Sequence, residues 1–203
     1  MRRAPKSPGP RAGALAGALA LAALAAPGCI VVTLAPLYDG QTIEFEEGLL
    51  GTWVNAEDGQ TLVVARGQWR SYAITWTDGL GTQALTAHLT RVGGERFVDA
   101  MPAAGEDRGP LLIAGHVVAR LRRDKQALLL EMLDYDWMRR SARRGALPRR
   151  HWALDERETL LLTMPTADLR AWLARHLEGE GPFAPPVRFE RKAERALDRD
   201  PSA

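Results

Sequence analysis

Short segments in which apolar and polar residues alternate run through the middle of the chain, and turn-forming residues separate them. In the segment 69–77, for example, one face carries Arg70, Tyr72, Ile74 and Trp76, and the other carries Trp69, Ser71, Ala73 and Thr75. A period of two residues is typical of a β-strand with one face against a core. The pattern predicts strands over residues 42–46, 49–54, 61–65, 69–77, 84–92, 95–101, 113–121, 127–133 and 159–163, with a last extended piece over 182–189.

Turn and helix signatures organise these segments into a fold. Asp78-Gly79 and Gly93-Gly94 lie between consecutive strand segments, as expected for β-hairpins, and residues 102–110 form a loop rich in proline, glycine and acidic residues. Two helices come late: one capped by Asp134 that ends before Gly145, and one capped by Thr166 with apolar residues at helical spacing up to position 177. The predicted fold is therefore mainly β (α+β), a curved antiparallel sheet of about eight strands that closes toward a barrel, with late amphipathic helices.

The N-terminus has a different pattern, in which four basic residues precede an apolar run of Ala, Leu and Gly from position 12 to 26. This run is short for a membrane span, which needs roughly 20 apolar residues, and it ends at Gly28-Cys29, which contains the only cysteine. The arrangement resembles the export signal of bacterial lipoproteins, although Ala26 and Pro27 depart from the usual residues before the cysteine. The resemblance implies cleavage before Cys29, acylation of its thiol and amine, and a stable attachment to a membrane.

These features divide the chain into a cleaved signal peptide (1–28), the lipidated Cys29 with a tether (29–40), a single β-rich domain (41–190) and a charged, frayed tail (191–203). Ile30 follows the cysteine where retained inner-membrane lipoproteins often carry Asp, so the resemblance favours the outer membrane, facing the periplasm. The alternative is an uncut signal anchor in the inner membrane, because the apolar run continues after Cys29.

Charge bears on the partners of the mature chain. The whole chain has 27 basic and 25 acidic residues, and loss of residues 1–28 removes four basic and no acidic ones, which leaves 23 against 25 and a net charge of −2. No basic stripe with interleaved aromatic residues is present, so the sequence argues against nucleic-acid binding. Six arginines between positions 139 and 150 are interpreted as a solvated helix face and loop, or alternatively as a patch that faces the membrane.

Gly51-Thr52-Trp53 lies in the predicted strand 49–54 and is similar to the Gly-x-Trp of lipocalins, in which the tryptophan closes one end of a barrel and the glycine allows close packing. Leu133-Asp134-Tyr135 is faintly similar to a second lipocalin motif. The order of Gly51-Thr52-Trp53, Asp99, the motif at 133–137 and the helix at 166–177 also resembles bacterial lipoproteins of unassigned function. That second resemblance implies no activity.

Candidate chemistry is sparse. Asp134 and Asp136, with Glu131, form an acidic pair or a cation site in one interpretation and a helix cap in the other, which we favour. His88 and His116 lie on separate predicted strands and offer too few ligands for zinc, so no metal site and no cofactor are predicted. The large aromatic residues Trp53, Trp69, Trp76 and Trp137 are candidates for lining a ligand pocket, or they fill a core.

The sequence therefore predicts a lipid-anchored protein of the cell envelope that is not an enzyme and serves as a structural or interaction module. Its expected partners are the membrane, through Cys29, and an envelope protein or a small apolar ligand. A lipocalin-like carrier of such a ligand is the alternative, and an envelope hydrolase that uses Asp134 and Asp136 is a distant third.

Overall fold

The computed structural model describes residues 30–103, 115–147, 152–154, 159–178 and 181–193. The predicted signal peptide, Cys29, most of the predicted loop at 102–110 and the tail beyond residue 193 lie outside the described residues. Within them, no helix is both long enough and apolar enough to cross a membrane.

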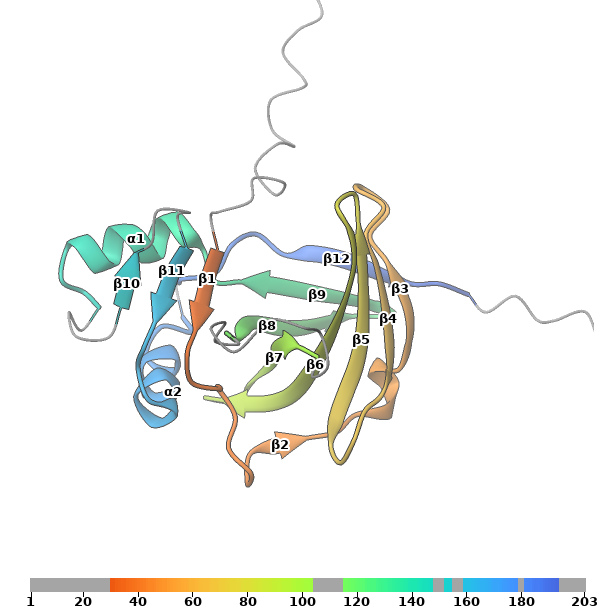
Figure 1. Cartoon of the computed structure of the whole chain (residues 1–203), viewed down its shortest axis with the longest axis horizontal. Helices are drawn as coiled ribbons and strands as arrows, with labels where there is room; N and C mark the ends of the chain where they lie inside the picture. The colour runs from red at the N-terminus through yellow and green to blue at the C-terminus, as the bar shows by residue number, and fades with distance from the viewer. Residues whose placement is uncertain (1–29, 104–114, 148–151, 155–158, 179–180, 194–203) are drawn as a thin grey trace, which may run out of the picture.

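Eight antiparallel strands form a closed barrel (Figure 1). In chain order they are β3 (Gly51–Val54), β4 (Thr61–Arg66), β5 (Ser71–Asp78), β6 (Gly81–Val92), β7 (Glu95–Pro102), β8 (Val117–Asp124), β9 (Ala127–Met132) and β12 (Val187–Arg191). Each strand pairs with the next, and β12 pairs with β3 to close the ring. The prediction of a mainly β fold with an antiparallel barrel is confirmed.

Tight turns join the strands where the sequence predicts them. At the β5–β6 hairpin, the Asp78 carboxylate accepts hydrogen bonds from the backbone N–H groups of Leu80 and Gly81, at 2.8 and 3.1 Å. Gly93 and Gly94 both have positive φ angles, which turns between twisted strands require. These local conformations fix the register of the hairpins and therefore which side chains face inward.

The barrel interior is an apolar core to which all eight strands contribute. Side chains alternate between the two faces of a strand, so each strand contributes to this core only the side chains of its inward face. Its buried members are Leu49, Trp53, Leu62, Val64, Tyr72, Ala87, Leu89, Leu121, Leu128 and Phe189.

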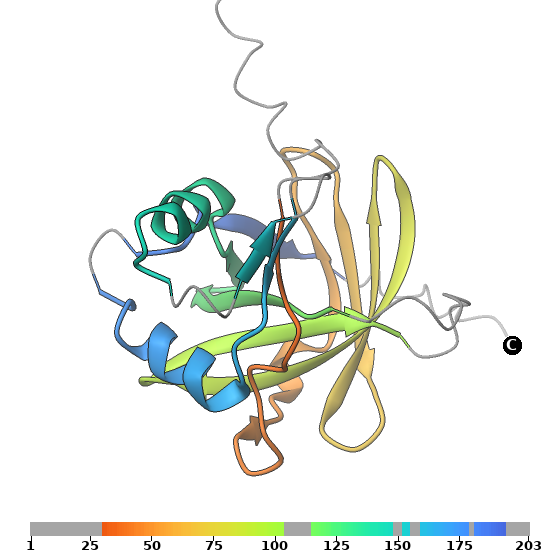
Figure 2. The ribbon, with the colours of Figure 1, turned by 60° about the vertical axis from the view of Figure 1, so that its left-hand side comes forward.

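A second layer covers one side of the barrel (Figures 1 and 2). It contains a three-stranded sheet of β1 (Ile30–Thr33), β11 (Thr159–Leu162) and β10 (Trp152–Leu154), together with helices α1 (Tyr135–Arg143) and α2 (Thr166–Ala174). Thr33 and His116 exchange two backbone hydrogen bonds of 2.8 Å and so join this sheet to the chain just before β8. Apolar side chains from the layer and from the outer face of β7 and β8, including Phe97 and Val118, form a second core.

The structure differs from the sequence prediction in the segment 29–40, which was expected to be a tether. Ile30–Thr33 is a strand, and the side chain of Leu37 is fully buried in the second core. The physical reason is that β11 offers an open edge to which the apolar residues after Cys29 add in parallel. β10 was not predicted either.

The helix caps give one confirmation and one correction. The Asp134 carboxylate accepts a hydrogen bond from the backbone N–H of Trp137 at 2.6 Å, as predicted for the cap of α1. Thr166 is not the cap of α2, because that position belongs to Pro165. Instead the Thr166 hydroxyl donates to the carbonyl of Pro36, which ties α2 to the segment after β1.

Candidate functional site

One end of the barrel is closed around the fully buried Trp53. The indole N–H of Trp53 donates to the carbonyl of Leu49, at the end of the short 3-10 helix η1 (Glu47–Leu49). On the other side, the guanidinium of Arg191 lies 4.3 Å from the ring centroid of Trp53 and donates to the carbonyls of Leu50 and Gly48. This contact joins the first and last barrel strands, so Arg191 belongs to the domain and not to a frayed tail.

Gly51 is required by this arrangement for two reasons. Its φ angle is +129°, a conformation in which an L-residue is strained. A β-carbon at this position would also lie 2.6 Å from the Nη1 atom of Arg191. The absence of a side chain at Gly51 therefore lets the guanidinium of Arg191 pack closely against this end of the barrel.

Ion pairs and an aromatic stack hold the segment before β3 across the closed end. Glu46 pairs with Arg96 of β7 and Arg123 of β8, each at 2.6 Å. Phe45 stacks on Tyr72 with a centroid distance of 4.8 Å, and the Tyr72 hydroxyl accepts from the backbone N–H of Glu46. Burial is the main cause that raises the pKa of Tyr72 above its ordinary value. The strand β2 (Ile43–Glu44) completes this cover by pairing with β6.

The opposite end of the barrel is less covered. Several inward-facing side chains here retain partial exposure although they pack on the barrel core, namely Ile74, Trp76, Ala100, Leu130 and Val187. They lie on four strands, toward the end of the barrel that carries the β5–β6 turn. Since these residues face the interior, their partial exposure means that solvent contacts the rim of the apolar core at this end.

Trp76 carries a polar group into this partly exposed region. Its indole nitrogen Nε1 is itself buried and has no hydrogen-bond partner among the described residues. An indole N–H is a donor only, and an unpaired buried donor costs free energy. A ligand with an acceptor atom at this position would supply the missing partner.

The four tryptophans that the sequence suggested for one pocket lie in three places. Trp53 and Trp76 both belong to the barrel interior. Trp69 lies in the β4–β5 turn and is 66% exposed. Trp137 lies in α1 and packs on Trp172 and His176, in the second core. The four do not line one pocket, because the β4–β5 turn places Trp69 outside the barrel and α1 packs on its outer layer.

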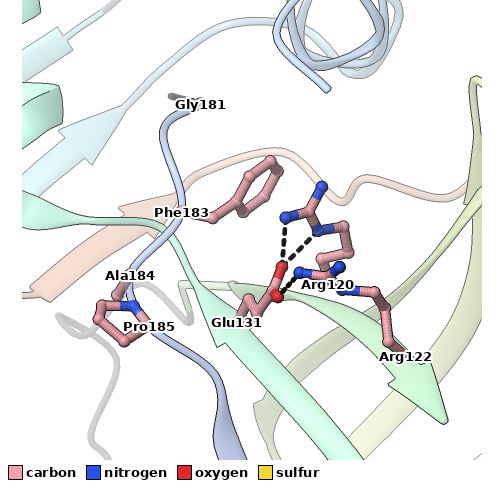
Figure 3. A pocket seen from close by; sticks show the side chains of 7 residues that line it. All are labelled: Arg120, Arg122, Glu131, Gly181, Phe183, Ala184 and Pro185. Atoms are coloured by element: carbon pink, nitrogen blue, oxygen red, sulfur yellow. Dashed lines mark hydrogen bonds and ion pairs between the residues drawn. The ribbon is translucent and has the colours of Figure 1, made fainter. Parts of the chain in front are cut away.

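A cavity of about 370 Å³ that is wide open to solvent lies outside the barrel, between β8, β9 and the segment that leads to β12 (Figure 3). Arg120, Arg122 and Glu131 form its polar wall, and Gly181, Phe183, Ala184 and Pro185 line it from the other side. Because Arg120 is opposite Glu131 in the β8–β9 register, these side chains point to the same face of the hairpin.

The carboxylate of Glu131 is only 2% exposed and lies between the two guanidinium groups. Arg120 donates to one carboxylate oxygen and Arg122 to the other. The guanidinium of Arg120 also lies 4.2 Å from the ring centroid of Phe183. Burial lowers the pKa of Arg120, and the nearby charge of Glu95 opposes that shift.

A third polar cluster lies on the outer face of β6 and β7, under the segment after β1. Asp99 is 1% exposed; it accepts from the backbone N–H of Leu37 at 2.6 Å and from His116 Nδ1 at 2.7 Å. The ring of His88 lies 4.1 Å from that of Tyr38, and its buried Nδ1 has no hydrogen-bond partner among the described residues. Burial lowers the pKa of His88 and, with the charge of Asp99, raises the pKa of Tyr38.

This cluster brings His88 and His116 to the same carboxylate. Within the part of the chain that the structure describes, no group of three or more His, Cys, Asp or Glu side chains is arranged to hold a metal ion. Asp134 caps α1, and Asp136 pairs with Arg139 one helical turn away, on the exposed side of that helix. Both carboxylates therefore have structural partners.

No protein family model, no curated protein and no solved structure matches this chain. The geometry of the described residues therefore carries the functional argument.

Sequence reasoning missed the three arginines of these sites and did not predict the buried ion pairs of Glu131 or the buried hydrogen bonds of Asp99. Arg191 was placed in the tail because it stands in a charged stretch. Arg120 and Arg122 are two residues apart in one strand, and Glu131 lies in the next strand, after the turn at 124–127. In a hairpin with this register the three side chains lie on the same face, so the register indicated the buried ion pair. Asp99 stands next to apolar residues in a predicted strand, which indicates a carboxylate that needs buried partners.

Proposed function

We propose that the protein is a carrier of a small apolar ligand, which it binds inside the barrel through the less covered end. The observation that carries the proposal is the contrast between the two ends. One is closed by Trp53, Leu49 and the segment that Glu46 holds, whereas inward-facing apolar side chains at the other retain exposure.

The size of the barrel supports this function. An eight-stranded barrel has an interior that side chains just fill or that holds one small ligand. Apolar surface in contact with water is unfavourable, by roughly 25 cal/mol per Å², so a ligand that covers Trp76 and its neighbours gains affinity. The buried indole N–H of Trp76 favours a ligand with an acceptor atom, such as a carbonyl or ether oxygen.

We further propose that acyl chains on Cys29 attach this carrier to the outer membrane, on the periplasmic side. The support is the leader pattern at 1–28, which lies outside the described residues. Mass spectrometry of the mature N-terminus tests it: we expect a chain that begins at an acylated Cys29, and an unmodified thiol on a chain that begins at Met1 would refute it.

Ligand binding is tested by titrating the purified full chain with N-phenyl-1-naphthylamine, an apolar probe that fluoresces in apolar surroundings. We expect saturable probe fluorescence with energy transfer from tryptophan. Trp76→Phe removes half or more of the energy transfer, whereas Trp69→Phe, in the exposed turn, leaves it unchanged.

A second pair of variants tests the location. Ala100→Phe places a larger side chain in the interior at the less covered end and lowers the affinity at least tenfold, whereas Thr75→Phe, on the exposed face of β5, does not. The carrier function is contradicted if both variants bind the probe as tightly as the original chain. It is also contradicted if binding of the probe does not saturate. Equal loss in both also contradicts it.

An interaction module is the second candidate, because large apolar side chains are exposed at the tips of two hairpins. Trp69 is 66% exposed and Leu80 is 77% exposed. If the probe does not bind, crosslinking at these two positions in intact envelopes tests this function, and specific loss of a crosslinked partner with Trp69→Ser or Leu80→Ser is the expected result.

A further inference from the structure

We propose that the cavity outside β8 and β9 is a second binding site, for a small organic carboxylate whose anionic group contacts Arg122 and whose apolar part contacts the wall of Phe183, Ala184 and Pro185. This site is separated from the barrel interior by the sheet itself. The proposal therefore does not depend on the carrier function.

Two arginines face one buried carboxylate at the polar edge of this site. Arg120 and Arg122 share a single buried carboxylate, that of Glu131, and both of its oxygens already accept from guanidinium groups. Glu95 acts on Arg120 through its charge but forms no ion pair within the described residues. A carboxylate that arrives here meets the N–H donors of Arg122 that Glu131 does not engage, and charge-assisted hydrogen bonds are the strong ones.

The two arginines have different roles. Arg120 is 14% exposed, donates to Glu131 and to the carbonyl of Leu177, and stacks on Phe183, so it is held in place. Arg122 is 51% exposed and uses one nitrogen, Nη2, on Glu131. A guanidinium has five N–H donors, and those of Arg122 that Glu131 does not engage are therefore the ones available to a ligand.

Glu131 is what makes the site rigid. A buried carboxylate fixes both guanidinium groups at one edge of the cavity, so a ligand does not have to order two long side chains (Figure 3). Less conformational entropy is lost on binding when the site is held in this way. Glu131 itself is saturated with donors and is not available to a cation.

The opposite wall and the volume define the rest of the ligand. Phe183, Ala184 and Pro185 present an aromatic ring and aliphatic carbons beside the polar edge, and the cavity measures about 370 Å³. Ligand pockets measure about 300–1,000 Å³, so this cavity lies at the small end of the range. An aromatic or short aliphatic monocarboxylate matches both walls better than a bare phosphate ion, which has no apolar part.

The test is a calorimetric titration of the full chain with benzoate, benzamide and inorganic phosphate, while backbone amide resonances are followed by NMR. We expect saturable benzoate binding with shifts at residues 181–185, binding of benzamide at least tenfold weaker, and no displacement of N-phenyl-1-naphthylamine. Arg122→Gln lowers the benzoate affinity at least tenfold.

Arg188→Gln is the matched control, because Arg188 is 46% exposed and also pairs with a carboxylate, that of Asp124, on β8. It leaves benzoate affinity unchanged. Phe183→Leu weakens the binding of benzoate several-fold and leaves the arginines and Glu131 of the polar edge in place. The urea midpoint of each variant shows that it is folded.

Four results would overturn the proposal. Benzoate that does not saturate, or that binds Arg122→Gln as well as the original chain, excludes the site. Equal binding of benzamide excludes the role of charge. Binding of phosphate without benzoate excludes an organic carboxylate as the ligand.

Discussion

The closed end of the barrel gives a quantitative prediction for Gly51→Ala. The new β-carbon is strained at a φ angle of +129°, which costs of the order of 1–2 kcal/mol. It also displaces the guanidinium of Arg191, since the added carbon would lie 2.6 Å from Nη1. Arg191 then loses its contact with Trp53 and its two carbonyl acceptors.

The loss of the Arg191 contacts has its own magnitude. Stacking of a guanidinium on a buried tryptophan contributes about 1 kcal/mol, and the two solvent-exposed hydrogen bonds together contribute about 1 kcal/mol. Arg191→Ala should therefore lower the free energy of unfolding by about 2 kcal/mol. Gly51→Ala, which adds strain to that loss, should lower it by about 3–4 kcal/mol.

A double-mutant cycle separates the two effects. In the Arg191→Ala background no guanidinium remains to be displaced, so Gly51→Ala should cost only the strain, about 1–2 kcal/mol. Urea unfolding of the four proteins, followed by tryptophan fluorescence, measures the free energies. A coupling below about 0.5 kcal/mol would refute the idea that Gly51 makes room for Arg191.

Two further predictions concern the cluster around Asp99. Asp99→Asn weakens the acceptor for His116 and for the backbone N–H of Leu37. We expect this substitution to lower the free energy of unfolding by about 2 kcal/mol, measured by urea unfolding. Asp136→Asn, at an exposed carboxylate, is the control. The pKa of His88 lies below its ordinary 6.5 in the folded protein, mainly because of burial. The unfolded chain therefore binds its proton first as the pH falls, so stability declines below about pH 6.5. Urea midpoints between pH 7.5 and 5.5 should fall less in His88→Phe, which keeps the stacking on Tyr38; identical slopes for the two proteins would exclude this contribution.

Local features of the sequence predicted the barrel strands well, because a hairpin depends on neighbours in the chain. Alternation within 69–77 places Tyr72, Ile74 and Trp76 on one face, and in the structure that face points into the barrel. The turn at Asp78-Gly79 and the cap at Asp134 are also local, and both are confirmed. Thr166 failed as a cap because a tertiary contact with Pro36 uses its hydroxyl.

The sequence by itself determined the strand segments of the barrel, the hairpin turns and the two helices after them, since period, turn residues and capping residues act over a few positions. Only the tertiary structure decided that β12 meets β3, which brings Arg191 onto Trp53 across nearly the whole domain. It also decided that Leu37 and His116 share the carboxylate of Asp99, and that Trp69 and Trp137 lie away from the barrel interior. The physical reason is that these contacts depend on the closure and register of the whole sheet, and on the face of the barrel that the inserted helices cover. No short stretch of residues encodes either of these features.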